Sequence, residues 1–215
     1  MSHAPCPLCG QSDTEPYHAD ALRSYHCCSR CGFVHVPSPF HLSAEAERGE
    51  YDRHHNAVGD PGYRRFLGRL ATPLAERVPP PATGLDFGCG PGPALAAMLR
   101  EAGYTVAVFD PFYAPQNAVL ATGYDFITAT EVVEHLARPG AELRRLVGLL
   151  RSGGRLGIMT KLVIDRERFS GWHYIRDPTH IGFFSRATFA WWAAAEGLGL
   201  EFVDDDVIFL RRLPA

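Results

Sequence analysis

Apolar residues recur along the chain with two alternating periods, which together predict a parallel α/β sheet. Short apolar runs typical of buried strands occupy residues 85–87, 105–110, 124–129 and 155–160. Segments with helical spacing occupy residues 61–78, 93–102 and 185–196, and a fourth begins at Pro139 with the apolar stripe Leu143, Leu146, Val147 and Leu150. Residues 200–212 have the pattern of two strands around an acidic turn. The alternation favours a doubly wound, mostly parallel sheet, to which the final hairpin adds one antiparallel strand.

Residues that begin and end helices divide the chain further. Asp60 is suited to cap the helix that Pro61 opens, and the later helices are expected to end at Gly103, at Ser152–Gly154 and at Gly197. A run of prolines over 79–81 cannot continue a helix and marks a linker. We therefore expect a small Cys-rich region over residues 1–40, a helical lid or linker region over 41–82, and an α/β domain over 83–215.

Composition is that of a globular protein, with 46% hydrophobic and 21% charged residues. No apolar run approaches the roughly 20 residues that span a bilayer. The first residues show no basic stretch followed by an apolar one, so a cytoplasmic location is expected. The formal net charge of −3 argues against strong non-specific binding of nucleic acid. We therefore expect neither a membrane nor a nucleic acid as the main partner, and oligomeric state stays open.

The segment from Gly84 to Gly103 places a glycine-rich turn between a strand and a helix, where backbone N–H groups attract an anionic group. The dinucleotide fingerprint needs three spaced glycines, but here Pro93 occupies the third site after Gly88 and Gly90. This substitution counts against NAD. Asp110 ends the next strand, where an acidic side chain can hydrogen-bond a ribose. The turn thus predicts a nucleoside-type ligand other than a dinucleotide.

The segment "LDFGCGPG" resembles motif I of the class I S-adenosylmethionine-dependent methyltransferases, in which an acidic residue precedes Gly-x-Gly-x-Gly. Asp86, Gly88, Gly90 and Gly92 match that motif. The segments "YDFITATEVVEHL", "LLRSGGRLGIMT" and "WHYIRDPTHIGFF" resemble later parts of the same family, and the matches together extend from about residue 51 to residue 212. The resemblance implies a Rossmann-like fold whose turn holds the methionine part of the cofactor, with Asp110 on the ribose.

The residues expected around S-adenosylmethionine are Tyr51, Asp86, Gly88, Cys89, Gly90, Gly92, Asp110, Pro111, Phe112, Thr130, Glu131 and His135. Cys89 is expected to pack against the cofactor or the core rather than to act as a nucleophile. Glu134 and His135 either border the methionine end or are plain helix residues. Tyr51–Asn56 either closes over the cofactor as a lid or forms a solvated helix surface.

One departure from the family pattern concerns the adenine. Only thirteen residues separate Asp110 from Tyr124, too few for a helix and a full third strand. The acid that often recognises adenine after that strand is therefore missing or displaced, and Phe112 is the candidate to cover the base instead.

The N-terminal region contains two matching Cys-x-x-Cys-Gly knuckles, Cys6 with Cys9 and Cys28 with Cys31. Four thiolates in two such pairs suit tetrahedral Zn²⁺, whereas Cys27 does not reproduce the spacing of the first knuckle. A segment of this size has too small a core to fold without the metal. Because it carries few basic residues, the predicted zinc ribbon is expected to be structural or to shape the substrate site.

The methyl acceptor is expected beyond the carboxyl ends of the strands, where the loop "GWHYIRDPTH" leaves the strand 155–160. The catalytic candidates in this loop are His173, Tyr174, Asp177 and His180. Either histidine is able to act as a general base near neutral pH, or to serve only as hydrogen-bonded structure. A metal site made of His173, Asp177 and His180 is disfavoured, because their spacing follows no established ligand pattern.

These observations predict a methyltransferase that uses S-adenosylmethionine and carries a structural Zn²⁺. Its acceptor is expected to be an oxygen, nitrogen or carbon atom of a small molecule or biosynthetic intermediate. Three alternatives stay open: a nicotinamide-dependent oxidoreductase, an RNA methyltransferase, and a non-catalytic protein that binds S-adenosylmethionine.

Overall fold

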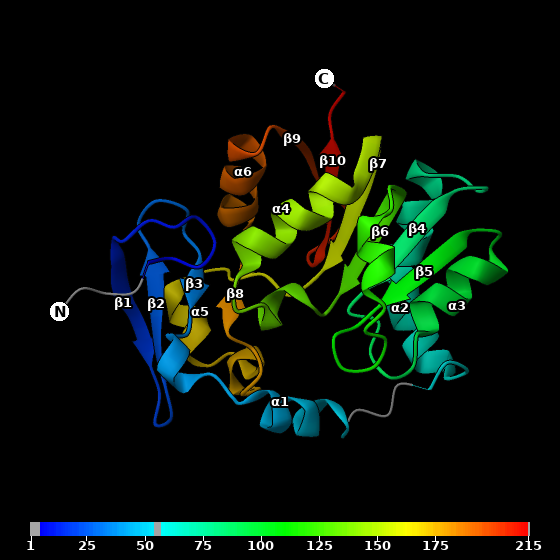
Figure 1. Cartoon of the computed structure of the whole chain (residues 1–215). Helices are drawn as coiled ribbons and strands as arrows, with labels where there is room; N and C mark the ends of the chain where they lie inside the picture. The colour runs from blue at the N-terminus through cyan, green and yellow to red at the C-terminus, as the bar shows by residue number, and fades with distance from the viewer. Residues whose placement is uncertain (1–4, 54–56, 215) are drawn as a thin grey trace.

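The structure, a computed structural model, describes residues 5–53 and 57–214 and contains two sheets (Figure 1). Residues 54–56 of the predicted lid segment lie outside the described residues. The larger sheet has the strand order β5-β4-β6-β7-β10-β9, and the smaller has the order β1-β2-β3-β8. Within the described residues, no helix is long and apolar enough to cross a membrane.

The larger sheet confirms the predicted α/β architecture. Its strands are β4 (Thr83–Phe87), β5 (Thr105–Phe109), β6 (Tyr124–Thr130), β7 (Leu150–Met159), β9 (Leu198–Phe202) and β10 (Val207–Arg212). Strands β5, β4, β6 and β7 are parallel, whereas β10 runs antiparallel to both of its neighbours, β7 and β9. The predicted C-terminal hairpin is therefore present, and it supplies the one antiparallel strand of this sheet.

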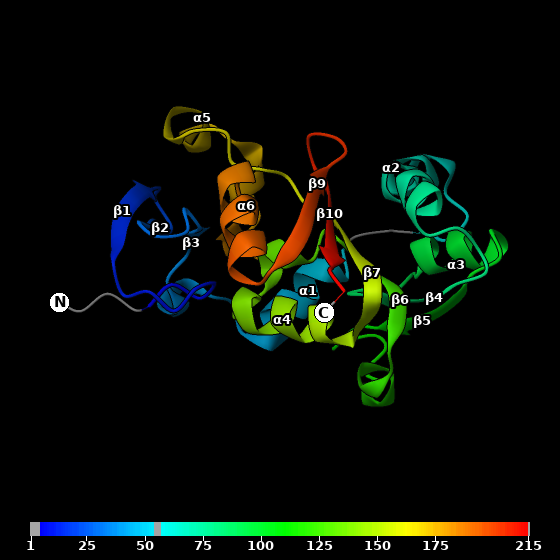
Figure 2. The ribbon, with the colours of Figure 1, turned by 90° about the horizontal axis from the view of Figure 1, so that it is seen from above.

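Helices cover both faces of the larger sheet, and Figure 2 shows α2 and α4 on opposite sides. The helices are α1 (Ala44–Tyr51), α2 (Pro61–Arg77), α3 (Ala94–Glu101), α4 (Pro139–Leu149), α5 (Arg166–Ser170) and α6 (Arg186–Ala195). Neighbouring residues of β6 point to opposite faces, as a strand requires. Phe126 is buried in the core under α2 and α3, and Ile127 in the core under α4 and α6. Asp60 caps α2, as predicted, by accepting the N–H of Tyr63.

Two stretches differ in detail from regular elements. Strand β7 begins at Leu150, five residues before the predicted start, so Ser152–Gly154 lie within the strand rather than after the helix. Gly153 has a φ of +78°, and the pairing with β6 shifts there, so a bulge absorbs the extra residues. Between β5 and β6, the described chain contains a short 3-10 helix, η2 (Asn117–Ala121), and no strand, which confirms the predicted loss of the third strand.

The smaller sheet joins the N-terminal region to a distant part of the chain. Its first strands are β1 (Thr14–Ala19), β2 (Ser24–Cys28) and β3 (Val34–His35), while β8 (Gly182–Phe183) follows the "DPTH" segment. Val34 pairs with Phe183, and His35 with Gly182. Short 3-10 helices occur at η1 (Ser38–Phe40), η3 (Val133–His135) and η4 (His173–Arg176). The Cys-rich region is thus continuous in structure with the segment that carries the predicted acceptor residues.

Arg23 makes the most extensive polar link between these two regions. Its Nη2 donates to the carbonyl oxygens of Ile175 and Asp177 at 2.6 and 2.7 Å, and its Nη1 donates to that of Pro178 at 3.1 Å. Its Nε donates to the hydroxyl of Tyr25 at 2.9 Å. Arg23 is only 8% exposed. One guanidinium therefore holds three carbonyl groups of the η4 segment in place.

We expect Arg23→Met to lower the free energy of unfolding by about 2–4 kcal/mol, because the variant leaves buried carbonyl groups without a charged donor. The matched control is Arg30→Met, since Arg30 is exposed and contacts only the face of the Trp191 ring among the interactions described. Its loss should cost less than about 1 kcal/mol. Urea unfolding measures both values, and equal losses would contradict the assigned role of Arg23.

Candidate functional site

The glycine turn after β4 has the backbone that its sequence predicts. Gly88 and Gly90 have φ values of +72° and +63°, a region that disfavours other residues. A Cβ at Gly88 would lie 2.4 Å from the Val132 side chain, whereas one at Gly90 would meet open space. The N–H groups of Gly88 and Cys89 donate to the carbonyl of Phe109 and fasten the turn to the end of β5. The turn is therefore open at Gly90 and closely packed at Gly88.

Asp110 lies directly against this turn. One carboxylate oxygen accepts the N–H of Gly90 at 3.0 Å, and the other accepts those of Phe112 and Tyr113 at 2.8 and 3.1 Å. Since a carboxylate has about four acceptor positions, three backbone bonds fix its orientation and leave capacity for a further donor.

Asp86 lies in β4 just before the turn, and Cys89 lies within the turn. The hydroxyl of Thr128 donates to the Asp86 carboxylate at 2.8 Å, and burial raises the pKa of Asp86 to about 6. Burial, followed by the nearby carboxylates of Asp86 and Asp110, raises the pKa of the Cys89 thiol to about 12. A thiol that stays protonated is a poor nucleophile, which agrees with a packing role for Cys89.

The carboxyl end of β6 carries two unusual features. The hydroxyl oxygen of Thr130 is buried and has no hydrogen-bond partner among the described residues. Glu131 follows with a φ of +52°, a strained conformation for a residue with a side chain. Burial, and then the nearby Glu134 carboxylate, raise the pKa of Glu131 to about 8. Strain and an unpaired polar atom at the same strand end are typical of a functional site.

Glu134 lies in η3 and has no exposed surface. The hydroxyl of Tyr174 donates to one carboxylate oxygen at 2.5 Å, and that of Thr160 donates to the other at 3.0 Å. Burial raises the pKa of Glu134, while the nearby His180 and Tyr174 oppose that shift. The carboxylate thereby joins the ends of β6 and β7 to η4.

The predicted acceptor residues separate into two groups. Tyr174 and His180 are buried, and their rings contact each other with centroids 4.0 Å apart. The Asp177 carboxylate lies 3.8 Å from His180 Nε2. Burial raises the pKa of Asp177, but hydrogen bonds from Thr179 and the nearby His180 outweigh that effect and lower the pKa overall. His173 lies at the start of η4 and is exposed. The structure therefore brings together three of the four predicted residues.

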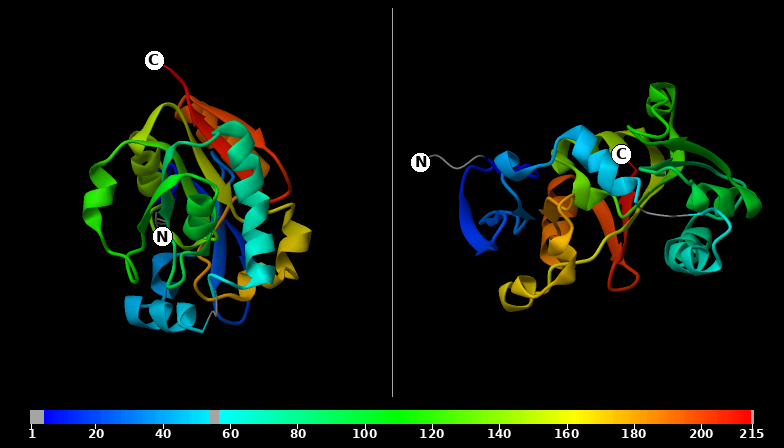
Figure 3. Two further views of the ribbon diagram at one scale, coloured as in Figure 1. Left: turned by 90° about the vertical axis from the view of Figure 1, so that its right-hand side faces the viewer. Right: turned by 90° about the horizontal axis from the view of Figure 1, so that it is seen from below.

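Helix α1 lies beneath the carboxyl ends of the parallel strands (Figure 3). The Tyr51 ring contacts that of His135 with centroids 5.3 Å apart and that of Phe112 at 5.9 Å. The hydroxyl of Tyr113 donates to the Asp52 carboxylate at 2.6 Å. The described part of the predicted lid thus bridges the loop after β5 and the η3 turn.

The four cysteines of the two knuckles form one cluster, with every Sγ within 4.8 Å of the others. The Cys6–Cys31 and Cys9–Cys28 sulfur pairs are each 3.6 Å apart. Zn–S bonds of about 2.3 Å in a tetrahedron place sulfur atoms about 3.8 Å apart. The cluster is therefore compatible with zinc, and it contains Cys28 rather than Cys27.

Several residues that contribute to the candidate site were not predicted from the sequence. Arg23 was not singled out, since its partners lie about 150 residues further along the chain. Thr160 directly follows strand β7 of the parallel sheet, and that position was a usable signal. Glu134 was considered, but the sequence did not reveal that it would be fully buried.

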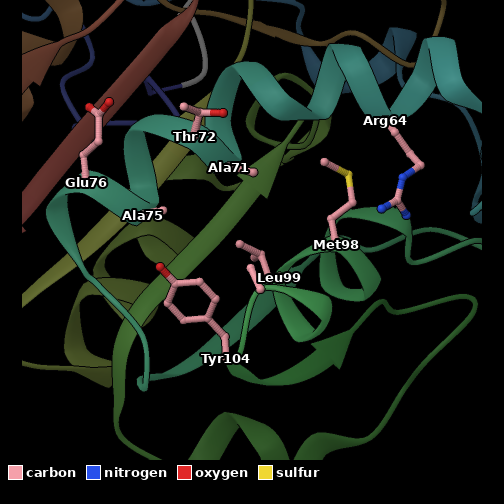
Figure 4. A pocket seen from close by; sticks show the side chains of 9 residues that line it. Arg64, Ala71, Thr72, Ala75, Glu76, Met98, Leu99 and Tyr104 are labelled. Atoms are coloured by element: carbon pink, nitrogen blue, oxygen red, sulfur yellow. The ribbon is translucent and has the colours of Figure 1, made fainter.

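A surface groove lies away from this site, between α2 and α3 (Figure 4). Its lining residues are Arg64, Ala71, Thr72, Ala75, Glu76, Met98, Leu99, Ala102 and Tyr104. None of these residues belongs to the glycine turn or to the acceptor segment. The groove is therefore not part of the candidate site.

Comparisons with known proteins agree with this geometry. A family model described as a methyltransferase domain matches residues 60–203. The 1,6-didemethyltoxoflavin-N1-methyltransferase of Burkholderia thailandensis, solved with 1,6-didemethyltoxoflavin and S-adenosylhomocysteine, is 20% identical with a TM-score of 0.56; the match covers 93% of this chain and 100% of that chain. CalO1, a methyltransferase in calicheamicin biosynthesis solved with S-adenosylhomocysteine, is 17% identical with a TM-score of 0.51; the match covers 72% of this chain and 55% of that chain.

The curated proteins contain no match to this sequence. The two structural likenesses, both at low identity, show a shared fold. The family model, in contrast, covers well over half of the 215 residues. The chain therefore belongs to the methyltransferase domain family and is a methyltransferase with the fold of the S-adenosylmethionine-dependent enzymes.

Proposed function

We propose that this enzyme transfers the methyl group of S-adenosylmethionine to a small-molecule acceptor bound between α1 and the 172–180 segment. The observation that carries the proposal is the convergence of the glycine turn, Asp110 and the unpaired Thr130 hydroxyl at one edge of the sheet. Ligands of open parallel sheets bind beyond the carboxyl ends of the strands, where these groups lie. Both structural neighbours described above were solved with S-adenosylhomocysteine, which adds support.

The residues at this edge fit the cofactor in chemistry and position. We assign the methionine part to the turn of Gly88, Cys89, Gly90 and Gly92, supported from beneath by Asp86. The Asp110 carboxylate would accept the ribose hydroxyls. The buried Thr130 hydroxyl is a polar group that a bound ligand would satisfy. The further contacts that we propose are Tyr51, Pro111, Phe112, Glu131 and His135.

The cofactor supplies an activated methyl group when bound, so this chain mainly has to orient the acceptor and exclude water. Orientation of reactants contributes about 7–11 kcal/mol in favourable cases. Of the two candidate histidines we favour His180, because it is buried beside Tyr174 and Asp177 while His173 is exposed. Burial, and then the nearby His135, lower the pKa of His180, which keeps its ring neutral and able to accept a proton.

We further propose that Cys6, Cys9, Cys28 and Cys31 hold one structural Zn²⁺. Their sulfur positions suit a tetrahedral ion, and Arg23 and the β3–β8 pairing would transmit the stability of the ribbon to the acceptor segment. The ribbon would then act on the acceptor side of the reaction rather than on the cofactor.

Formation of S-adenosylhomocysteine from S-adenosylmethionine, followed with a panel of small oxygen, nitrogen and carbon nucleophiles, tests the proposed function. Turnover of one small molecule supports it. Turnover confined to bulk RNA would instead support the RNA methyltransferase alternative. Tight binding of S-adenosylhomocysteine without turnover of either class would support a non-catalytic protein.

Asp110→Asn should weaken S-adenosylhomocysteine binding at least about tenfold, because it removes a charged hydrogen-bond acceptor. The matched control is Asp125→Asn, since Asp125 lies in β6 near its amino end and bonds to Thr83 and Arg151. The affinity of Asp125→Asn for S-adenosylhomocysteine should stay within about twofold of the wild-type value. Isothermal titration calorimetry measures both, and an unchanged affinity in Asp110→Asn would refute the ribose assignment.

Metal analysis of the purified protein should find about one Zn per chain. Cys28→Ser should lose the metal, because it removes one of four ligands. Cys27→Ser is the matched control at the neighbouring position, and its zinc content should equal that of the wild type. Loss of zinc from Cys27→Ser alone would show that the ligand set is wrong.

A further inference from the structure

Two histidines flank the buried Glu134 carboxylate. Glu134, His135 and His180 each offer one ligand atom, and these atoms all lie within 4.8 Å of one another. The side chains of Glu134, His180 and His135 are 0%, 9% and 15% exposed. The three residues therefore form a compact group of nitrogen and oxygen atoms inside the protein, separate from the cysteine cluster.

Hydrogen bonds determine which ring nitrogen of each histidine carries a proton. The Nδ1 atom of His180 lies 2.7 Å from the carbonyl oxygen of Tyr174, and that of His135 lies 3.1 Å from the carbonyl oxygen of Thr179. A carbonyl oxygen only accepts, so each Nδ1 has to donate. The lone pair of each neutral ring is therefore on Nε2, and His135 Nε2 lies 4.0 Å from the Glu134 carboxylate. Histidines that bind metals are commonly oriented by a carbonyl in this way.

The carboxylate is oriented as firmly as the rings. Hydroxyl groups of Tyr174 and Thr160 donate to its two oxygens, each of which keeps a second acceptor position. Two more carboxylates adjoin the group: Asp177 lies 3.8 Å from His180 Nε2, and the strained Glu131 lies near Glu134. Imidazole nitrogens and carboxylates thus gather in one place, which is a donor set that a divalent cation binds.

We propose that Glu134, His135 and His180 bind a divalent transition-metal ion. Two imidazole nitrogens and one carboxylate oxygen suit Zn²⁺, Co²⁺, Ni²⁺ or Fe²⁺ better than Mg²⁺ or Ca²⁺. Two metal–ligand bonds of about 2.1 Å span at most about 4.2 Å. The ligand atoms therefore have to approach one another by roughly 1 Å when the ion binds.

The consequence for catalysis rests on the proposed function. A metal at this position would lower the pKa of a coordinated acceptor hydroxyl. In that form of the enzyme His180 is a ligand, and the metal rather than the imidazole promotes deprotonation. The acceptor class that fits is a small molecule with an ionisable oxygen at or beside the methylated atom.

Cobalt titration of protein that carries one zinc per chain, in the cysteine cluster, tests the site without methyl transfer. We expect a second ion per chain in calorimetry, with d–d absorption but no thiolate-to-cobalt charge-transfer band. His180→Asn keeps a donor to the Tyr174 carbonyl and removes Nε2, so it should weaken cobalt binding at least tenfold. His135→Asn likewise keeps a donor to the Thr179 carbonyl and removes Nε2, and it replaces His180→Asn in the test if that variant fails to fold. His18→Asn, a half-buried histidine in β1, is the matched control and should stay within twofold.

The outcomes separate this inference from the proposed function. Absence of a second cobalt ion, cobalt that appears only with the thiolate band, or equal affinity in all the histidine variants would overturn the metal site. S-Adenosylhomocysteine binding is measured on the same samples. Cobalt binding without S-adenosylhomocysteine binding would support the metal site and contradict the proposed function, and the reverse result would do the opposite.

Discussion

A carboxylate with no exposed surface has to be satisfied by the protein, and Glu134 is satisfied by groups from separate parts of the chain. Thr160 donates from just beyond the end of β7 and Tyr174 from η4, while the Glu134 backbone carbonyl accepts the N–H of Ile181. These bonds draw the 172–183 segment against the edge of the sheet. Arg23 then holds the same segment from the ribbon side. The candidate acceptor site exists because both sets of bonds meet on one short segment.

This arrangement gives the two ends of the candidate site different origins. The cofactor end is built from the α/β fold itself, since the glycine turn and Asp110 are held by backbone bonds between β4 and β5. The acceptor end depends on the N-terminal region, whose third strand pairs with β8. The family match over residues 60–203 covers the cofactor end and the 172–183 segment, but not the N-terminal region that holds this segment. The particular acceptor is expected to depend on the second.

Much of the fold was predictable, because periodicity and glycine or proline positions report local structure. The strand–helix alternation, the terminal hairpin and the missing third strand were all predicted correctly, and the four clustered cysteines are those that the knuckle spacing selects. The early start of β7 was missed, because Gly153 and its neighbours form a bulge instead of a turn. Arg23 was missed, because partners about 150 residues away leave no trace in the local sequence pattern. Thr160 was missed although its position directly after β7 was a usable signal. Burial of Glu134 is likewise a property of the assembled sheet edge.

The central claim is that S-adenosylmethionine binds between the glycine turn and α1 and faces the 172–180 segment. Hydrogen–deuterium exchange with and without S-adenosylhomocysteine tests it most directly, because it reports where the ligand lies along the chain. The account predicts slower exchange at residues 88–92, 110–113 and 47–53. Protection confined to the groove between α2 and α3, or no protection at saturating ligand, would contradict it.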